Sequence, residues 1–275
     1  MSGIGEVFAR CAAERRAAFI PFIMAGDPRL AATADQLSAL AAGGADIIEL
    51  GVPFSDPMAD GPVNQRAATR ALAAGTRLSA ILELIARNRD QLGVPLVLYT
   101  YFNPLCARGL DRFAEQASAS GVDGVLCVDL PPEEASRFFV PALRERGVDT
   151  IFLLAPTSTR DRVARVGEVS SGFVYYVSRT GVTGEREALP PDLVRDVKRL
   201  RRRLDLPLAV GFGISSPAQV AALGEVADAV VVGSHLVRLI EEMGDDPALP
   251  AMLEQRVREL AAPLEPRYPR ARAAR

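Results

Sequence analysis

The chain has 275 residues, of which 49% are hydrophobic and 24% are charged, and its formal net charge at pH 7 is −2. This balance is typical of a globular protein and excludes a largely disordered chain, while the small net charge supplies no overall attraction to nucleic acid. No apolar stretch approaches the ~20 residues that a bilayer-spanning helix needs. We therefore expect neither a nucleic-acid partner nor a membrane segment.

Eight short apolar runs, rich in β-branched residues, recur along the chain and alternate with segments of helical periodicity, for example 34–41 and 79–85. The runs occupy residues 19–23, 46–50, 96–100, 124–128, 151–154, 173–177, 208–212 and 229–232. Because the runs are continuously apolar, they indicate parallel strands buried on both faces. Eight such units predict an α/β fold, a (β/α)8 TIM barrel. The alternative, a doubly wound sheet, lacks the GxGxxG phosphate fingerprint after its first strand.

The ends of the chain differ from this repeat. An extra helix is expected over residues 2–15, before the first strand, and the N-terminus lacks the features of a signal peptide. We predict one domain over residues 1–262 and a basic, flexible tail over residues 263–275, which is interrupted by prolines.

Cysteine and histidine usage narrows the chemistry. The chain has three cysteines, Cys11, Cys106 and Cys127, and they form no CxxC pair. We therefore expect no disulfide framework, and we expect a cytoplasmic location. With His235 as its single histidine, the chain offers no histidine cluster for a metal, and we expect no metal site. A Ser-His-Asp triad would have to use His235.

The longest segments between strand starts follow the second and sixth runs, and extra length in a barrel falls in the loops that carry active sites. Glu49 lies near the C-terminal end of the second run, where a carboxyl pointing into the barrel mouth would be an acid/base candidate with a raised pKa. The alternative is an exposed residue or an arginine partner. The loop that follows contains Asp56 and Asp60, and both carboxylates could simply cap turns. Alternatively, Asp60 faces Glu49 across the mouth and shares proton transfer with it.

Two glycine-containing segments indicate a phosphate site. Residues 211–216 follow the seventh run, and residues 231–234 follow the eighth and lead into a helix beginning near His235. Backbone N–H groups at these places hold phosphate in many barrels, although glycines also mark ordinary tight turns. The loop 178–190, with Gly181 and Gly184, is predicted to be a mobile lid, with a plain solvent loop as the alternative.

Several motifs together resemble the tryptophan synthase alpha chain family. They are residues 19–22 with 26–28, residues 49–62, residues 178–184 and residues 211–216, and the similarity runs from about residue 5 to 260. The resemblance implies aldol cleavage of indole-3-glycerol phosphate to indole and glyceraldehyde 3-phosphate. A difference is His235, where the family often has alanine.

The resemblance also implies roles for individual residues. Glu49 would carry the proton to indole C3 and from the glycerol hydroxyl, and Asp60 would hold the indole N–H. Separately, the place of Thr183 between Gly181 and Gly184 in the lid loop predicts that its hydroxyl bonds and positions Asp60. The other implied contacts are Phe22, Leu153, Tyr175 and Phe212 as walls for the indole, Gly184, Gly213, Gly233 and Ser234 as phosphate ligands, and Asp56 and Pro57 at a partner interface. That partner would be a beta chain carrying pyridoxal phosphate, in an α2β2 tetramer. This chain itself would need no cofactor.

Other functions remain open at this stage. A sugar-phosphate epimerase would need histidine metal ligands, and indole-glycerol-phosphate synthase would need catalytic lysines, whereas the chain has the single lysine Lys198. A stand-alone indole-3-glycerol-phosphate lyase and a non-catalytic activating subunit of the beta chain are the further alternatives.

Overall fold

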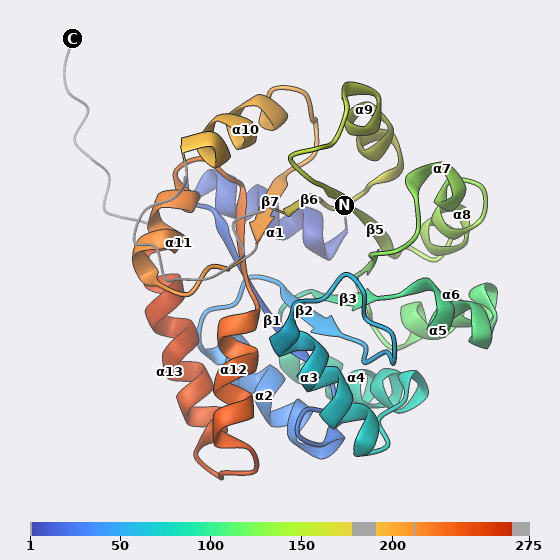
Figure 1. Ribbon diagram of the computed structural model, residues 1–275, viewed down its shortest axis with the longest axis vertical. Coiled ribbons are helices and arrows are strands. Elements are labelled where there is room, and N and C mark those ends of the chain that lie inside the picture. Colours follow the sequence, from blue (N-terminus) through green and yellow to red (C-terminus); the bar gives the residue numbers. More distant parts are fainter. Residues whose placement is uncertain (1, 178–190, 212, 266–275) are drawn as a thin grey trace.

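The computed structural model describes residues 2–177, 191–211 and 213–265, and within them eight parallel strands close into a barrel in sequence order (Figure 1). The strands are β1 (Ala18–Met24), β2 (Ile48–Gly51), β3 (Leu96–Thr100), β4 (Gly124–Cys127), β5 (Asp149–Leu154), β6 (Val174–Val177), β7 (Leu208–Gly211) and β8 (Ala229–Val232). The predicted (β/α)8 barrel is confirmed. Strand bounds shift slightly, and β2 begins at Ile48 rather than at Asp46.

Helices surround the barrel on its outer side (Figure 1). They are α2 (Leu30–Ala42), α3 (Pro62–Ala73), α4 (Leu78–Leu92), α5 (Phe102–Arg108), α6 (Leu110–Ala119), α7 (Pro132–Ala135), α8 (Phe139–Arg144), α9 (Arg160–Val169), α10 (Pro191–Arg201), α11 (Pro217–Gly224), α12 (Ser234–Met243) and α13 (Leu249–Ala261). The extra length after β2 is therefore a helix, α3, placed between the loop 52–61 and α4.

The expected extra helix before the first strand is α1 (Gly3–Ala13), which closes the end of the barrel where the strands begin. Its apolar face, including Ile4, Val7 and Phe8, packs against inward side chains such as Ile20 and Val97. The hydroxyl of Ser2 accepts the N–H of Gly5, which caps the helix. With this end closed, the opposite end is the open mouth of the barrel.

Three aspartates at the closed end follow one pattern, in which the carboxylate accepts an N–H from the first or second residue of a neighbouring strand and also binds an arginine. Asp46 joins Phe19 N and Arg16, Asp123 joins Leu96 N and Arg89, and Asp228 joins Leu208 N and Arg201. Each carboxylate therefore accepts hydrogen bonds from a backbone N–H at the start of a strand and from an arginine side chain. This end is built for stability, as is usual in barrels of this class.

After α13 the chain continues into a short 3-10 helix, η1 (Ala262–Leu264), and Leu264 is buried against α11. Packing therefore continues two residues past the predicted end of the domain, and residues 266–275 lie outside the described part. Among the described helices, none combines the length and apolar character needed to cross a membrane.

Candidate active site

Glu49 lies on β2 with its side chain inside the barrel, because its neighbours Ile48 and Leu50 face the surrounding helices. Only 2% of the residue is exposed, and Oε1 has no hydrogen-bond partner among the described residues. Burial, with the nearby charge of Asp60 as the smaller cause, raises the pKa of Glu49 to about 8. The alternative of an exposed or arginine-paired residue is wrong. The carboxyl is able to hold or release a proton near neutral pH.

Asp60 ends the loop after β2, directly before the N-cap of α3 at Gly61. Its Oδ2 accepts a hydrogen bond from the Tyr101 hydroxyl at 2.7 Å, and its Oδ1 accepts one from Asn64 Nδ2 at 3.5 Å. Burial raises the pKa of Asp60, and the hydrogen bonds from Tyr101, Asn64 and Tyr99 oppose that rise. Asp60 is thus held by hydrogen-bond partners, whereas Glu49 Oε1 has none among the described residues.

The two carboxyl groups act on each other, since the charge of Asp60 contributes to the raised pKa of Glu49. The loop 52–61 therefore folds back so that Asp60 reaches the mouth above β2. Two carboxyl groups in unlike surroundings can divide proton transfer and charge stabilisation between them. The structure brings these two predicted residues together.

The apolar side of the mouth is formed by residues of β1, β5 and β6. Phe22 pairs in register with Glu49, and its ring meets that of Tyr99 edge to face at a centroid distance of 5.4 Å. Leu153 and Tyr175 are register partners on β5 and β6. Burial and the charge of Glu49 raise the pKa of the Tyr175 hydroxyl well above its ordinary value, which keeps it protonated beside Glu49. Phe212 lies outside the described residues.

Two tyrosines near the carboxyl pair were missed by the sequence analysis. Tyr99 touches Phe22, and the Tyr101 hydroxyl both donates to Asp60 and accepts the N–H of Ala59 at 3.0 Å. The signal was present, because Val97, Tyr99 and Tyr101 follow the period of two that turns side chains into the barrel. Tyr101 also packs on Phe54, with ring centroids 5.1 Å apart, and so anchors the loop 52–61.

The residues predicted to bind phosphate lie at the ends of two adjacent strands, β7 and β8. Gly213 has a φ of +69°, which favours glycine. Gly233 is the N-cap of α12, and Ser234 is its first residue, so the positive end of the helix dipole lies at the carboxyl end of β8. A Cβ on Gly233 would lie 3.2 Å from Phe22, which places this end of α12 beside the apolar wall. Thr183 and Gly184, like the predicted lid, lie outside the described residues.

The predicted interface residues lie on the outer part of the loop 52–61. Asp56 is exposed and accepts a hydrogen bond from Ser55 Oγ at 2.6 Å, while Pro57 is half-buried. The neighbouring Met58 is 92% exposed, which is unusual for a large apolar side chain.

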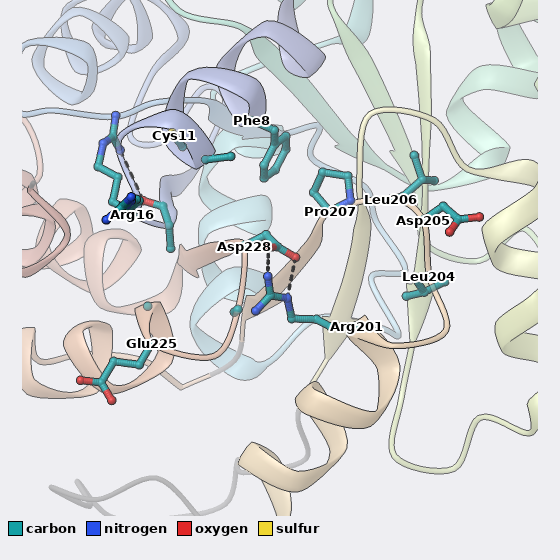
Figure 2. Close-up of a pocket in the computed structure, with 15 residues that line it drawn as sticks. Phe8, Cys11, Arg16, Arg201, Leu204, Asp205, Leu206, Pro207, Glu225 and Asp228 are labelled. Carbon is teal, nitrogen blue, oxygen red and sulfur yellow. Dashed lines mark hydrogen bonds and ion pairs between the residues drawn. The ribbon is translucent and has the colours of Figure 1, made fainter. Parts of the chain in front are cut away.

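A separate cavity of about 540 Å³ lies at the closed end of the barrel, between α1, α10 and α11 (Figure 2). Its lining includes Phe8 and Cys11, and the Arg201–Asp228 ion pair crosses it. It lies at the strand ends opposite the carboxyl pair. Among the described residues, no group of three or more histidine, cysteine, aspartate or glutamate side chains is placed to hold a metal ion.

A closed (β/α)8 barrel with two interacting carboxyl groups at its mouth is the architecture of a barrel enzyme that works by proton transfer. Comparison with known proteins identifies the family of enzymes. Residues 8–265 match the family model of the tryptophan synthase alpha chain, and the chain belongs to this family. It is the alpha subunit of a tryptophan synthase, a carbon–carbon lyase of amino-acid biosynthesis.

Individual relatives agree over nearly the whole chain. The tryptophan synthase alpha chain of Solibacter usitatus is 52% identical over 260 residues, which cover 94% of this chain and 97% of the relative. The crystal structure of tryptophan synthase subunit alpha from Legionella pneumophila superposes with a TM-score of 0.86 at 36% identity, covering 95% of this chain and 99% of the other. A crystal structure of tryptophan synthase from M. tuberculosis gives a TM-score of 0.86 at 37% identity, with coverage of 96% and 99%.

Proposed function

We propose that Glu49 and Asp60 together cleave indole-3-glycerol phosphate into indole and glyceraldehyde 3-phosphate, the aldol cleavage that the family carries out. The observation that supports these roles is the buried Glu49 carboxyl, whose pKa of about 8 leaves a transferable proton on it at neutral pH. Phe22, Leu153, Tyr175 and Phe212 form the apolar walls of the indole site. The phosphate binds to backbone N–H groups at Gly184, Gly213, Gly233 and Ser234.

The cleavage follows in two proton transfers. Protonated Glu49 gives its proton to indole C3, which places positive charge on the ring nitrogen, and the Asp60 carboxylate stabilises that charge by accepting the indole N–H. The Glu49 carboxylate then takes the proton of the glycerol hydroxyl on the adjacent carbon. The bond from C3 to that carbon breaks, its electrons restore the indole ring, and the hydroxyl-bearing carbon becomes the aldehyde. Glu49 ends protonated, as it began.

The test replaces Glu49 by glutamine, which keeps the shape of the side chain and removes the acid. We expect Glu49→Gln to lower kcat by roughly 10² or more while the substrate still binds. Asp46→Asn is the matched control, because it neutralises another buried carboxyl at the closed end of the barrel. Near-wild-type turnover by Glu49→Gln would refute the assignment.

For partners, we propose a pyridoxal-phosphate-bearing beta chain in an α2β2 tetramer, with Asp56 and Pro57 at the interface and indole passed to the beta chain. The exposed Met58 between the two anchored ends of the loop supports a protein contact there. Indole release measured with and without a beta chain separates this role from a stand-alone lyase and from a non-catalytic activator, which would release none. We also propose a cytoplasmic location and one domain over residues 1–262.

A further inference from the structure

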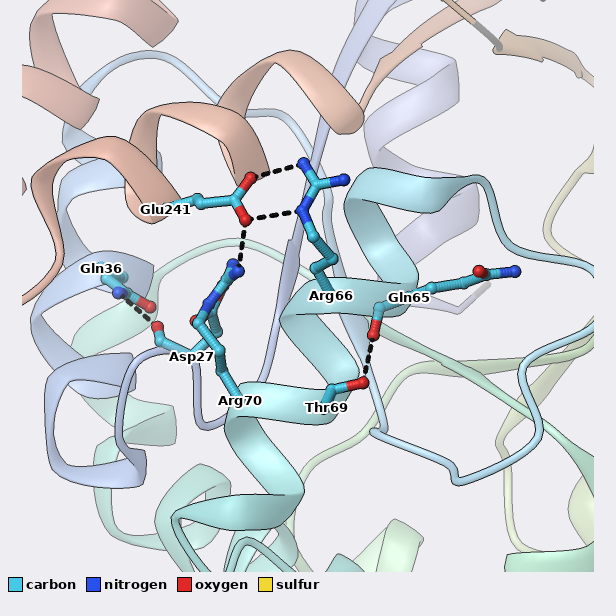
Figure 3. A network of polar contacts seen from close by, with 7 residues as sticks. All are labelled: Asp27, Gln36, Gln65, Arg66, Thr69, Arg70 and Glu241. Carbon is cyan, nitrogen blue, oxygen red and sulfur yellow. Dashed lines mark hydrogen bonds and ion pairs between the residues drawn. The ribbon is translucent and has the colours of Figure 1, made fainter.

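Four charged side chains join two helices and a strand-end loop on one side of the mouth (Figure 3). Arg70 on α3 binds both carboxylate oxygens of Asp27, in the β1–α2 loop, at 2.8 Å each. Its third nitrogen, Nη1, binds Glu241 on α12 at 2.6 Å. Arg66, one turn earlier on α3, binds both oxygens of Glu241 at 2.7 Å each. We call Asp27, Arg66, Arg70 and Glu241 the α3–α12 network.

Burial makes one end of this network costly to disturb. Asp27 is fully buried, and its backbone oxygen also accepts a hydrogen bond from Gln36. Loss of the Arg70 guanidinium would leave that carboxylate without its charged partner, which is strongly unfavourable in the interior. Glu241 lies at the surface, so a change there leaves the buried Asp27–Arg70 pair in place. The network can therefore be weakened at α12 without creating a buried charge.

Each of the two helices begins at the mouth of the barrel. Asp60 stands two residues before α3, and the first turn of α3 holds it through Asn64 and through Gln65, whose Nε2 donates to the Asp60 carbonyl at 2.9 Å. Helix α12 begins at Ser234, in the proposed phosphate site. The position of α3 thus sets the position of Asp60, and that of α12 sets the phosphate donors.

The two helices lie side by side with a close apolar seam beneath the network (Figure 1). Ala67, Ala68 and Ala71 of α3 pack with Val237 of α12 in one buried cluster that also contains Phe22. Small side chains at the seam bring the helix backbones close together, and the charged side chains bridge them outside it. The geometry joins α3, α12 and the Phe22 wall into one packed unit.

We propose that the α3–α12 network, with Arg70 at its centre, is a positioning device for the reaction: it holds the start of α3 and the start of α12 in fixed relation, so that Asp60 meets the indole ring when the phosphate is bound at α12. This inference rests on the proposed function. Arg70 and Glu241 act through the helices and touch no reacting atom.

The experiment compares Arg70→Gln, Glu241→Gln and the double variant with wild type in indole-3-glycerol phosphate cleavage. We expect each single variant to lower kcat roughly tenfold and to raise the inhibition constant of glycerol 3-phosphate several-fold, since small misplacements cost large rate factors. The double variant should lose less than the product of the two single losses, because both break one network. Arg70→Lys should recover part of the loss.

Arg87→Gln is the matched control, since it breaks a surface ion pair with Glu83 on α4, away from the mouth. If Glu241→Gln melts earlier but keeps wild-type kcat and the wild-type inhibition constant, the network is only structural and the inference is wrong. Multiplicative losses in the double variant would also overturn it. Wild type that fails to release indole would instead refute the proposed function.

Discussion

The hydroxyl of Tyr175 lies against the backbone of Gly211, so closely that a Cβ atom on residue 211 would stand 2.2 Å from Tyr175 Oη and 2.9 Å from its Cζ. Tyr175 is on β6, and Gly211 ends the neighbouring strand β7. The ring therefore reaches toward Glu49 only because residue 211 has no side chain. Glycine at position 211 therefore makes room for the Tyr175 ring at the mouth of the barrel and is not required by a turn.

From this contact we predict that Gly211→Ala lowers both the melting temperature and kcat, because the added methyl must displace Tyr175. In a Tyr175→Leu background the same substitution should cost less stability, since the two closest atoms are gone and only Val231 Cβ, at 3.0 Å, still crowds the methyl. Thermal melts of the four proteins in this double-mutant cycle measure the coupling. An equal loss in both backgrounds would show that Gly211 matters for another reason.

The raised pKa of Glu49 predicts a pH-dependent cost to stability. The folded protein favours the protonated form, with a pKa of about 8 against an ordinary value of 4.5, so the penalty is absent below 4.5 and grows until the pH passes 8. A pKa difference of one between the folded and unfolded chain corresponds to about 1.4 kcal/mol of stability. Glu49→Gln should therefore melt progressively higher than wild type as the pH rises from 5 to 8.5, in paired melts across that range. A constant difference between the two proteins would contradict a titrating Glu49.

Removal of the Tyr101 hydroxyl tests how Asp60 is held. Tyr101→Phe takes away a hydrogen bond that lowers the pKa of Asp60, together with the acceptor for the Ala59 N–H. We expect kcat to fall roughly tenfold and the acid limb of its pH profile to move to higher pH. Tyr176→Phe is the control, since that hydroxyl binds Asp196 on the helical side of the barrel. An unmoved acid limb would mean that Tyr101 does not tune Asp60.

Phosphate recognition at the ends of β7 and β8 gives a further prediction. Gly213→Val places a β-branched side chain at a φ of +69° and crowds the loop, so KM should rise while kcat changes little. Glycerol phosphate should compete with substrate, and a substrate lacking the phosphate should bind poorly. Inhibition assays with both compounds measure how much the phosphate contributes to binding. Equal affinity for the phosphate-free analogue would refute the site.

Local patterns in the sequence were enough to predict the barrel and the central carboxyl pair. Continuous apolar runs marked each strand, and Glu49, near the end of one run, was a candidate acid beside the alternative of an exposed or arginine-paired residue. Tyr99 and Tyr101 were missed although their alternation is regular, because a tyrosine in an apolar strand also suits an ordinary core position. Their role depends on the loop that returns Asp60 to them.

The α3–α12 network and the contact of Tyr175 with Gly211 have no comparable local signal. Arg70 and Glu241 are far apart in the sequence, and charged residues on helices usually face solvent. Only the packing of α3 against α12 makes them partners. Likewise, the closeness of Gly211 to Tyr175 depends on how one strand's side chain leans over its neighbour, which period and composition do not specify.

The Asp46 carboxylate at the closed end of the barrel makes the start of β1 sensitive to acid. Arg16 and the Phe19 N–H hold the pKa of Asp46 below its usual range, so the stability from this carboxylate is present above pH 3.8 and is lost as the pH falls further. Glu49, by contrast, costs nothing once it is protonated. Acid should therefore loosen the contact between Asp46 and the start of β1, with the Phe19 amide losing its protection from solvent exchange as the pH falls below 3.8.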